Sequence, residues 1–131
     1  MALSCHDKPH YEREKELISY LKTKHPEVLQ QDRCGLLVYR KPYRCDLFFD
    51  AGLVNDINNV LYSQKPEKLY VIYDFETTKD SLETNINFEN KVYFREDYNC
   101  LDRYGFRLAP MFFIIKNGRI DYWHTITKGC D

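Results

Sequence analysis

One cysteine of this chain has surroundings that favour thiol chemistry. Cys45 follows an apolar run, residues 34–40, and precedes a segment with helical periodicity. Backbone N–H groups at the start of a helix favour a thiolate, and the cations Arg40, Lys41 and Arg44 lie within five positions of Cys45. We therefore expect a lowered pKa at Cys45 and a capacity for thiol–disulfide exchange.

A proline near the C-terminus is the second feature that bears on chemistry. Pro110 stands directly before an apolar run, and proline cannot donate within a paired strand, so a strand must begin there. Asn117-Gly118 then predicts a tight hairpin turn between strands at 111–116 and 119–125. A proline that opens a buried hairpin strand is a typical place for a cis peptide bond, which we expect between Ala109 and Pro110.

Hydrophobic periodicity predicts the elements that must position these residues. Apolar residues spaced by three or four predict helices over 10–24 and from 46 to about 62. Short apolar runs predict strands over 34–40, 69–75 and 91–94, and an edge strand that starts at Val28 and Leu29. The segment 77–88 is ambiguous, with a short helix from Lys79 as one interpretation, and 97–104 is a short helix ended by Gly105.

The order of these elements indicates an α/β fold. Strands that alternate with helices imply right-handed βαβ crossovers and a parallel core sheet, to which the closing hairpin adds an antiparallel edge. We expect a three-layer domain with a central mixed sheet, a C-terminal β-hairpin and flanking helices. A chain of 131 residues can bury one such core, so residues 10–131 are predicted as one domain after a tail at 1–9.

The two chemical features together resemble a known family, the TlpA-type thiol–disulfide oxidoreductases of the thioredoxin-like superfamily. That family places its catalytic cysteine after a strand, in the style Leu-Val-Asn-Phe-Trp-Ala-Thr-Trp-Cys, and residues 37–45 read Leu-Val-Tyr-Arg-Lys-Pro-Tyr-Arg-Cys. It also has a cis-proline that opens the last hairpin, which Ala109-Pro110 and the following Met-Phe-Phe-Ile-Ile-Lys-Asn-Gly-Arg-Ile match. The resemblance covers roughly residues 30–127 and implies a thioredoxin-like fold.

The chain departs from the family motif at one decisive position. The family has Cys-x-x-Cys, whereas this chain has Cys45-Asp46-Leu47-Phe48. The second thiol normally attacks the mixed disulfide and releases the product, so Cys45 alone forms that intermediate without resolving it. Three roles stay open: monothiol exchange with glutathione or a partner's cysteine, resolution by Cys34 or Cys100, or no redox role.

A peroxidase is a weaker interpretation. The peroxiredoxins share the fold, but their motif is Pro-x-x-x-Thr/Ser-x-x-Cys. Here Pro42 stands where Thr or Ser is required, and Val38 where the proline is required.

The resemblance also implies a groove that binds an extended polypeptide. In a thioredoxin fold the backbone of the residue before the cis-proline, Ala109 here, pairs with the substrate chain. Tyr43, Arg44 and Phe48 flank Cys45 and would line the groove together with Pro110. The favoured function is therefore thiol–disulfide exchange or polypeptide recognition, without a cofactor. The alternative is a redox-inactive adaptor domain of the same fold.

Composition argues against several other classes. With 19 Lys and Arg against 20 Asp and Glu, the net charge of −1 gives no basic field for nucleic acid. No apolar run approaches the roughly 20 residues of a membrane span. The five cysteines and four histidines show no zinc-type spacing, so we expect no metal site.

The N-terminus gives one clue to the compartment. Leu3-Ser4-Cys5 resembles the cleavage end of a bacterial lipoprotein signal, in which the cysteine carries the lipid. This interpretation predicts an anchor at Cys5 and a periplasmic or membrane-anchored protein whose signal peptide has been removed. The alternative is an ordinary tail, with a cytoplasmic location.

Overall fold

The structure is a computed structural model that describes residues 10–39, 51–74, 80, 83–96, 103 and 110–126. Its helices are α1 (Glu14–Lys24), the 3-10 helix η1 (Pro26–Gln30) and α2 (Ala51–Gln64). Its strands are β1 (Arg33–Tyr39), β2 (Leu69–Tyr73), β3 (Lys91–Arg95), β4 (Met111–Lys116) and β5 (Arg119–Thr125). The prediction of an α/β chain is confirmed.

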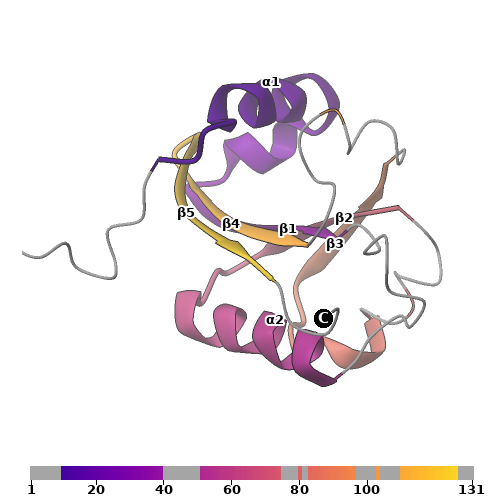
Figure 1. The fold of residues 1–131 in the computed structure, drawn as a ribbon. Coiled ribbons are helices and arrows are strands. Elements are labelled where there is room, and N and C mark those ends of the chain that lie inside the picture. Colours follow the sequence, from indigo (N-terminus) through magenta and orange to yellow (C-terminus); the bar gives the residue numbers. More distant parts are fainter. Residues whose placement is uncertain are drawn as a thin grey trace, which may run out of the picture.

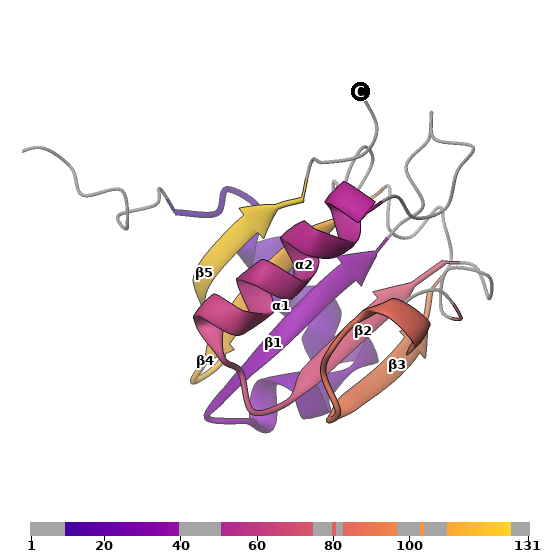
Figure 2. The same cartoon turned by 90° about the horizontal axis from the view of Figure 1, so that it is seen from below.

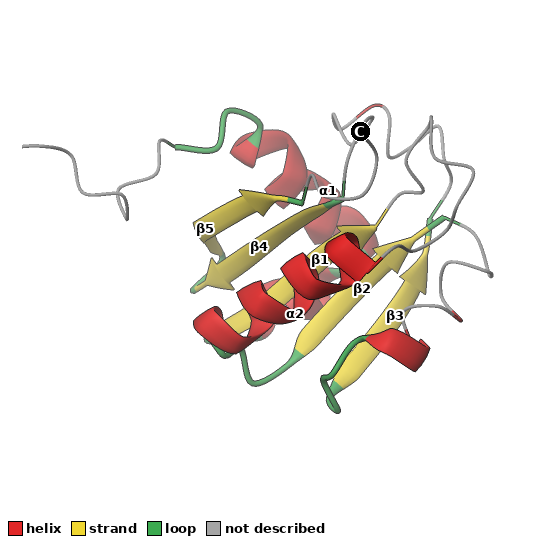
Figure 3. Cartoon of the chain, turned by 60° about the horizontal axis from the view of Figure 1, so that its bottom comes forward, coloured by secondary structure: helices red, strands yellow, loops and turns green. Residues whose placement is uncertain are grey.

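The five strands form one mixed sheet in the order β3-β2-β1-β4-β5 (Figure 3). Strands β1, β2 and β3 run parallel, whereas β4 pairs antiparallel with β1, and β5 pairs antiparallel with β4. The sequence prediction of a parallel core with an antiparallel C-terminal hairpin is therefore confirmed.

Helices cover both faces of the sheet, which is compatible with a three-layer α/β fold. Helices α1 and η1 lie on one face and α2 on the other (Figures 1 and 2). Each face buries its own hydrophobic cluster: Leu17 and Leu21 of α1 belong to one, and Ile57 and Leu61 of α2 belong to the other.

Strand β1 is buried on both faces, which explains its continuous apolar sequence. Leu36 and Val38 belong to the cluster under α1, whereas Leu37 and Tyr39 belong to the cluster under α2, and each is at most 1% exposed. Gly35 has no room for a side chain, since an added Cβ would lie 3.1 Å from atoms of both Leu69 and Pro66. A strand covered on both faces needs apolar residues at every position rather than at alternate ones.

Two predicted elements differ from the structure near the N-terminus. Helix α1 begins at Glu14, not at residue 10. Val28 belongs to η1 and is fully buried, so the predicted edge strand at Val28 and Leu29 is wrong. Pro26 explains this difference, because its fixed φ suits the first turn of a new helix as well as it suits an extended segment.

The other predicted boundaries agree with the structure to within two residues where both are described. The strand predicted over 34–40 is Arg33–Tyr39, and the one over 69–75 is Leu69–Tyr73. Residues 80 and 83–85 are helical, as is residue 103 of the helix predicted over 97–104. Residues 46–50, the predicted start of the second helix, and the tail with Cys5 lie outside the described residues.

The hairpin turn has the geometry that its sequence predicts. Asn117 and Gly118 have φ of 51° and 76°, so both central residues are left-handed, as a type I′ turn requires. The β4–β5 pairing contains one register shift between Ile114 and Ile115, which marks an irregularity in the outer strand β5.

A buried carboxylate ties α1 to this hairpin. Glu14 is 5% exposed, and it accepts hydrogen bonds from Arg119 Nε at 3.2 Å, Arg119 Nη2 at 3.3 Å and the Ile120 N–H at 2.8 Å. Burial alone would raise the pKa of the Glu14 carboxyl. The bonds from Arg119 and Ile120, with the charges of Arg119 and His10, outweigh burial and hold this pKa below its usual value.

This arrangement predicts a pH-dependent contribution to stability. In Glu14→Gln a neutral amide replaces the acceptor of two charge-assisted bonds, so the free energy of unfolding at neutral pH falls by roughly 1.5–3 kcal/mol. Because the folded-state pKa is the lower one, the stabilisation is present above the pKa of the unfolded chain and is lost as pH falls through the folded pKa. Urea unfolding at several pH values should show wild type and variant converging at acid pH.

A neighbouring carboxylate provides the control for this measurement. Glu16 is half-exposed and pairs with Arg13 at 3.7 Å, so Glu16→Gln should change the stability by less than about 1 kcal/mol. A Glu14→Gln effect that stays constant from neutral to acid pH would contradict the role assigned to this carboxylate.

Candidate functional site

The pairing of β1 with β4 brings Pro110 to the carboxyl end of the central strand. Val38 is the register partner of Met111, the first residue of β4, so Tyr39 and Pro110 are the next residues along the two strands. Pro110 is buried, and its carbonyl accepts a hydrogen bond of 2.9 Å from the Ile126 N–H. The start of β4 is thus fixed between β1 and the end of β5.

Most of the residues predicted for the site lie outside the described part of the chain. These are Cys45, Tyr43, Arg44, Phe48, Ala109 and Cys100. The peptide bond into Pro110 starts at Ala109, so the cis bond stays a prediction. The described residues give the frame instead: β1 ends at Tyr39, α2 is described from Ala51, and Pro110 opens β4.

The carboxyl ends of β2 and β3 add two acidic residues to the same edge of the sheet. Asp74 follows β2 and is 5% exposed. Glu96 follows β3, and its N–H donates to the Tyr73 carbonyl at 2.8 Å. Open α/β sheets bind ligands beyond the carboxyl ends of their strands, so this edge is the natural place for a site.

Glu96 also belongs to a partly buried polar cluster that the sequence did not reveal. The Tyr20 hydroxyl donates to the Glu96 carboxylate, and His25 Nε2 lies 3.9 Å from Glu96 Oε2. The His25 ring stacks on Phe94 with 4.1 Å between the ring centroids. Tyr20 and Glu96 are 76 positions apart in the chain, and no local pattern links such distant residues, so only the packing of α1 against β3 could reveal the cluster.

The environment of His25 favours the neutral imidazole. Burial is the largest influence on the pKa of His25 and lowers it. The carboxylates of Glu96 and Glu27 act in the opposite direction and Lys24 lowers it slightly further, so the pKa lies below its usual value. A neutral ring stacked on Phe94 is a packing group, and the cluster joins α1 to the outer strand β3.

Cys34 is the one candidate resolving thiol that the structure describes. Its side chain is fully buried, and its thiol donates to the Val28 carbonyl, with 3.4 Å between the two atoms. Burial raises the pKa of the Cys34 thiol to about 11, although Lys68 and Arg33 act in the opposite direction. Such a thiol carries little thiolate at neutral pH, so this environment suits packing; a resolving role for Cys34 stays a prediction.

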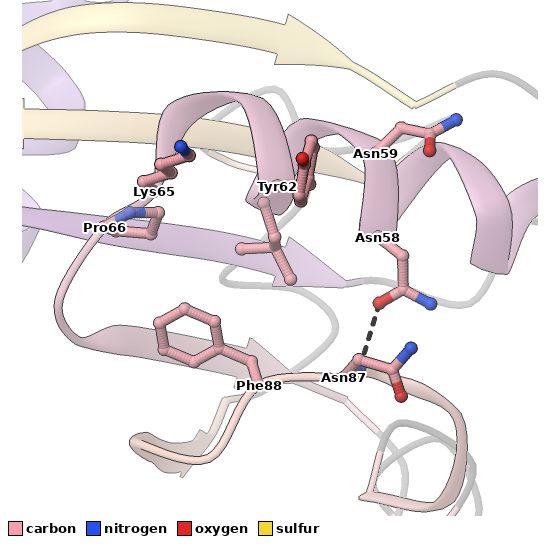
Figure 4. Close-up of a pocket in the computed structure, with 8 residues that line it drawn as sticks. Asn58, Asn59, Tyr62, Lys65, Pro66, Asn87 and Phe88 are labelled. Carbon is pink, nitrogen blue, oxygen red and sulfur yellow. Dashed lines mark hydrogen bonds between the residues drawn. The ribbon is translucent and has the colours of Figure 1, made fainter.

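A pocket of about 520 Å³ lies on the face of the sheet that α2 covers, between α2 and residues 87–88 (Figure 4). Figure 4 shows Asn58 reaching from α2 to Asn87, whose N–H donates to Asn58 Oδ1 at 3.0 Å. Asn58 Nδ2 donates in turn to the Asn85 carbonyl at 3.2 Å. Both ends of the Asn58 amide therefore hold the neighbouring segment, which gives the polar wall of this pocket a structural role.

The described residues also bear on other classes of site. Within them no three His, Cys, Asp or Glu side chains gather as a metal site requires. No helix in the described part of the chain has the length and apolar character needed to cross a membrane.

Comparisons with known proteins add no family to this description. Neither a protein-family model nor a curated protein matches the sequence.

The surroundings of Cys34 predict a thiol that is protected from reagents. Iodoacetamide at neutral pH should label Cys34 at least about a hundredfold more slowly in the folded protein than in urea, because labelling requires the buried thiol to become exposed and ionised. Peptide mapping by mass spectrometry measures this rate separately for each cysteine. Native labelling of Cys34 as fast as that of free cysteine would show that its packing opens readily, and would favour it as a resolving thiol.

Proposed function

We propose that this chain is a thioredoxin-like domain of TlpA type with a monothiol site. In this proposal Cys45 carries out thiol–disulfide exchange with a protein substrate, which binds as an extended polypeptide in a groove between Cys45 and Pro110. Tyr43, Arg44 and Phe48 line that groove on the cysteine side.

The observation that carries the proposal is the register of β1 and β4. The proposal requires the end of the strand before Cys45 to meet the start of the strand after Ala109. Val38 pairs with Met111, so the chain leaves β1 toward Cys45 at the same edge at which Pro110 enters β4. Cys45 is six positions after Tyr39, and six residues span at most about 20 Å, so the edge is within reach of its thiol.

The order of the elements gives independent support. The predicted sequence of strand, cysteine-bearing segment, helix, parallel strand and C-terminal hairpin corresponds to β1, residues 40–50, α2, β2 and β4–β5. In α/β folds, sites commonly lie at the segment that joins the carboxyl end of a strand to the helix that follows it.

The chemical step follows from a single thiol. The Cys45 thiolate attacks one sulfur of a substrate disulfide, a new S–S bond forms, and the other substrate sulfur leaves as a thiolate that takes up a proton. Phe48 offers no second thiol, so a thiol of the glutathione class, or a second cysteine of the substrate, must attack the mixed disulfide. That attack releases Cys45 as a thiolate and leaves the new disulfide on the product.

The proposal predicts fast exchange at Cys45 in mildly acidic solution. With oxidised glutathione at about pH 6, where an ordinary cysteine of pKa about 8.5 is almost wholly protonated, the protein should gain one glutathione at Cys45. Intact mass and peptide mapping locate the adduct. Its formation at least about tenfold faster than on an unstructured cysteine peptide is the expected result, because a lowered pKa supplies more thiolate.

The opposite result would favour the alternative function. If Cys45 reacts no faster than the peptide, or is closed to the reagent in the folded protein, the chain is a redox-inactive adaptor, and the exchange proposal is wrong. Cys45→Ser is the control, since its remaining cysteines report any adduct that forms elsewhere.

A second prediction tests the position of Phe48. Phe48→Cys restores Cys-x-x-Cys, and the variant should catalyse the reduction of insulin disulfides by dithiothreitol, whereas wild type should show little activity. The double variant Cys45→Ser with Phe48→Cys is the matched control and should be inactive. Equal activity in the single and double variants would contradict the assignment of Cys45 as the attacking thiol.

A further inference from the structure

The junction of α1 with the β4–β5 turn forms a pocket of about 540 Å³ that no part of the proposed function uses. Its walls come from one face of α1, with Lys15, Ser19 and Lys22 spaced by four and three positions, and from Gly118 and Arg119 of the turn. Figure 1 shows α1 lying over this hairpin. The volume falls in the range of small-molecule sites, about 300–1,000 Å³.

Positive charge dominates the lining of this pocket. Lys15, Lys22 and Arg119 are three cations, and the single carboxylate among the lining residues is Glu14. The ion pairs of the described residues involve neither Lys15 nor Lys22. Among the described residues, these two lysine charges therefore have no ion-pair partner.

The buried Glu14 carboxylate orients Arg119 in this pocket and has no free oxygen that would repel an anion. Both Glu14 oxygens are engaged, Oε2 by Arg119 Nε and the Ile120 N–H, and Oε1 by Arg119 Nη2 at 3.3 Å and by His10 Nε2 at 3.4 Å. The two bonds fix the Arg119 guanidinium, which has five N–H donors, at the rim of the pocket. The Arg119 side chain is 73% exposed, so its remaining donors are open to a ligand.

We propose that this pocket binds a small molecule that carries a phosphate monoester. A phosphate monoester bears a charge of about −1.5 to −2 at neutral pH, which matches the combined charge of Lys15 and Lys22. Two lysines, a guanidinium and the Ser19 hydroxyl offer more donors than one carboxylate can accept. The half-buried Ile18 supplies an apolar surface for the rest of the ligand.

The probe for this proposal is inorganic phosphate, followed by glycerol 3-phosphate. In an NMR titration of the ¹⁵N-labelled full chain at constant ionic strength, saturable shifts should appear at residues 15–22 and 118–119, with dissociation constants in the low millimolar range or below, on the order of ordinary weak ligands. Glycerol 3-phosphate should bind more tightly than phosphate, because Ile18 contacts its carbon chain.

Matched variants make the result decisive. Lys15→Gln and Lys22→Gln should each weaken binding by roughly tenfold, since each removes one charge-assisted contact. Lys24→Gln removes the same charge from an exposed position of α1 that does not line the pocket, and should leave binding unchanged. All three lysines are exposed, so the variants should fold as wild type does.

Three results would overturn the proposal: no saturable shifts, equal weakening by Lys24→Gln and Lys22→Gln, or binding to anionic phospholipid vesicles without binding to either phosphate probe. None of these readouts depends on Cys45, so the proposed exchange function stands or fails separately.

Discussion

The structure depends on the central position of β1. This strand pairs on both edges, with β2 in parallel and with β4 antiparallel, and its side chains enter a core on each face. Every other element is placed relative to it: α1 and α2 cover its two faces, and the hairpin extends the sheet from its antiparallel edge. In the proposed function the same pairing also places the site, because the chain leaves β1 toward Cys45 at the edge where Pro110 begins β4. An error in the register of β1 with β4 would therefore disturb both cores and the site together.

Much of this frame could be predicted from the sequence, because its signals are local. The continuous apolar run over 34–40 indicates a strand buried on both faces, and Asn117-Gly118 specifies a turn that needs two positive φ values. The edge strand at Val28 was a wrong prediction, because Pro26 is compatible with either an extended segment or a new helical turn. The long-range contacts between polar side chains could not be predicted. Glu14 meets Arg119 across 105 positions, and Tyr20 meets Glu96 across 76, and in each pair the partners are chosen by packing rather than by spacing.

The two candidate sites differ in how much of each could be predicted from the sequence. Cys45 and Pro110 could be identified as candidates from the sequence alone. Cys45 follows a predicted strand, and Pro110 stands directly ahead of an apolar run. The cationic pocket beside α1 has no such signal. Its lysines look like an ordinary solvated helix face, and Arg119 looks like a turn residue; they form one surface because Glu14 joins the two elements. The buried carboxylate thus serves both stability and the shape of the pocket.

The outer strands of the sheet have a consequence for how molecules of this protein meet one another. A regular outer strand offers unpaired backbone groups on which a second copy can add its own strand and begin a polymer. On one side, the register shift between Ile114 and Ile115 interrupts the regular ladder of β5. On the other side, β3 ends with Arg95, an exposed charged residue of the kind that disfavours the pairing of edge strands. These two features disfavour edge-to-edge assembly and help a chain with so many β-forming aromatic residues to avoid aggregation.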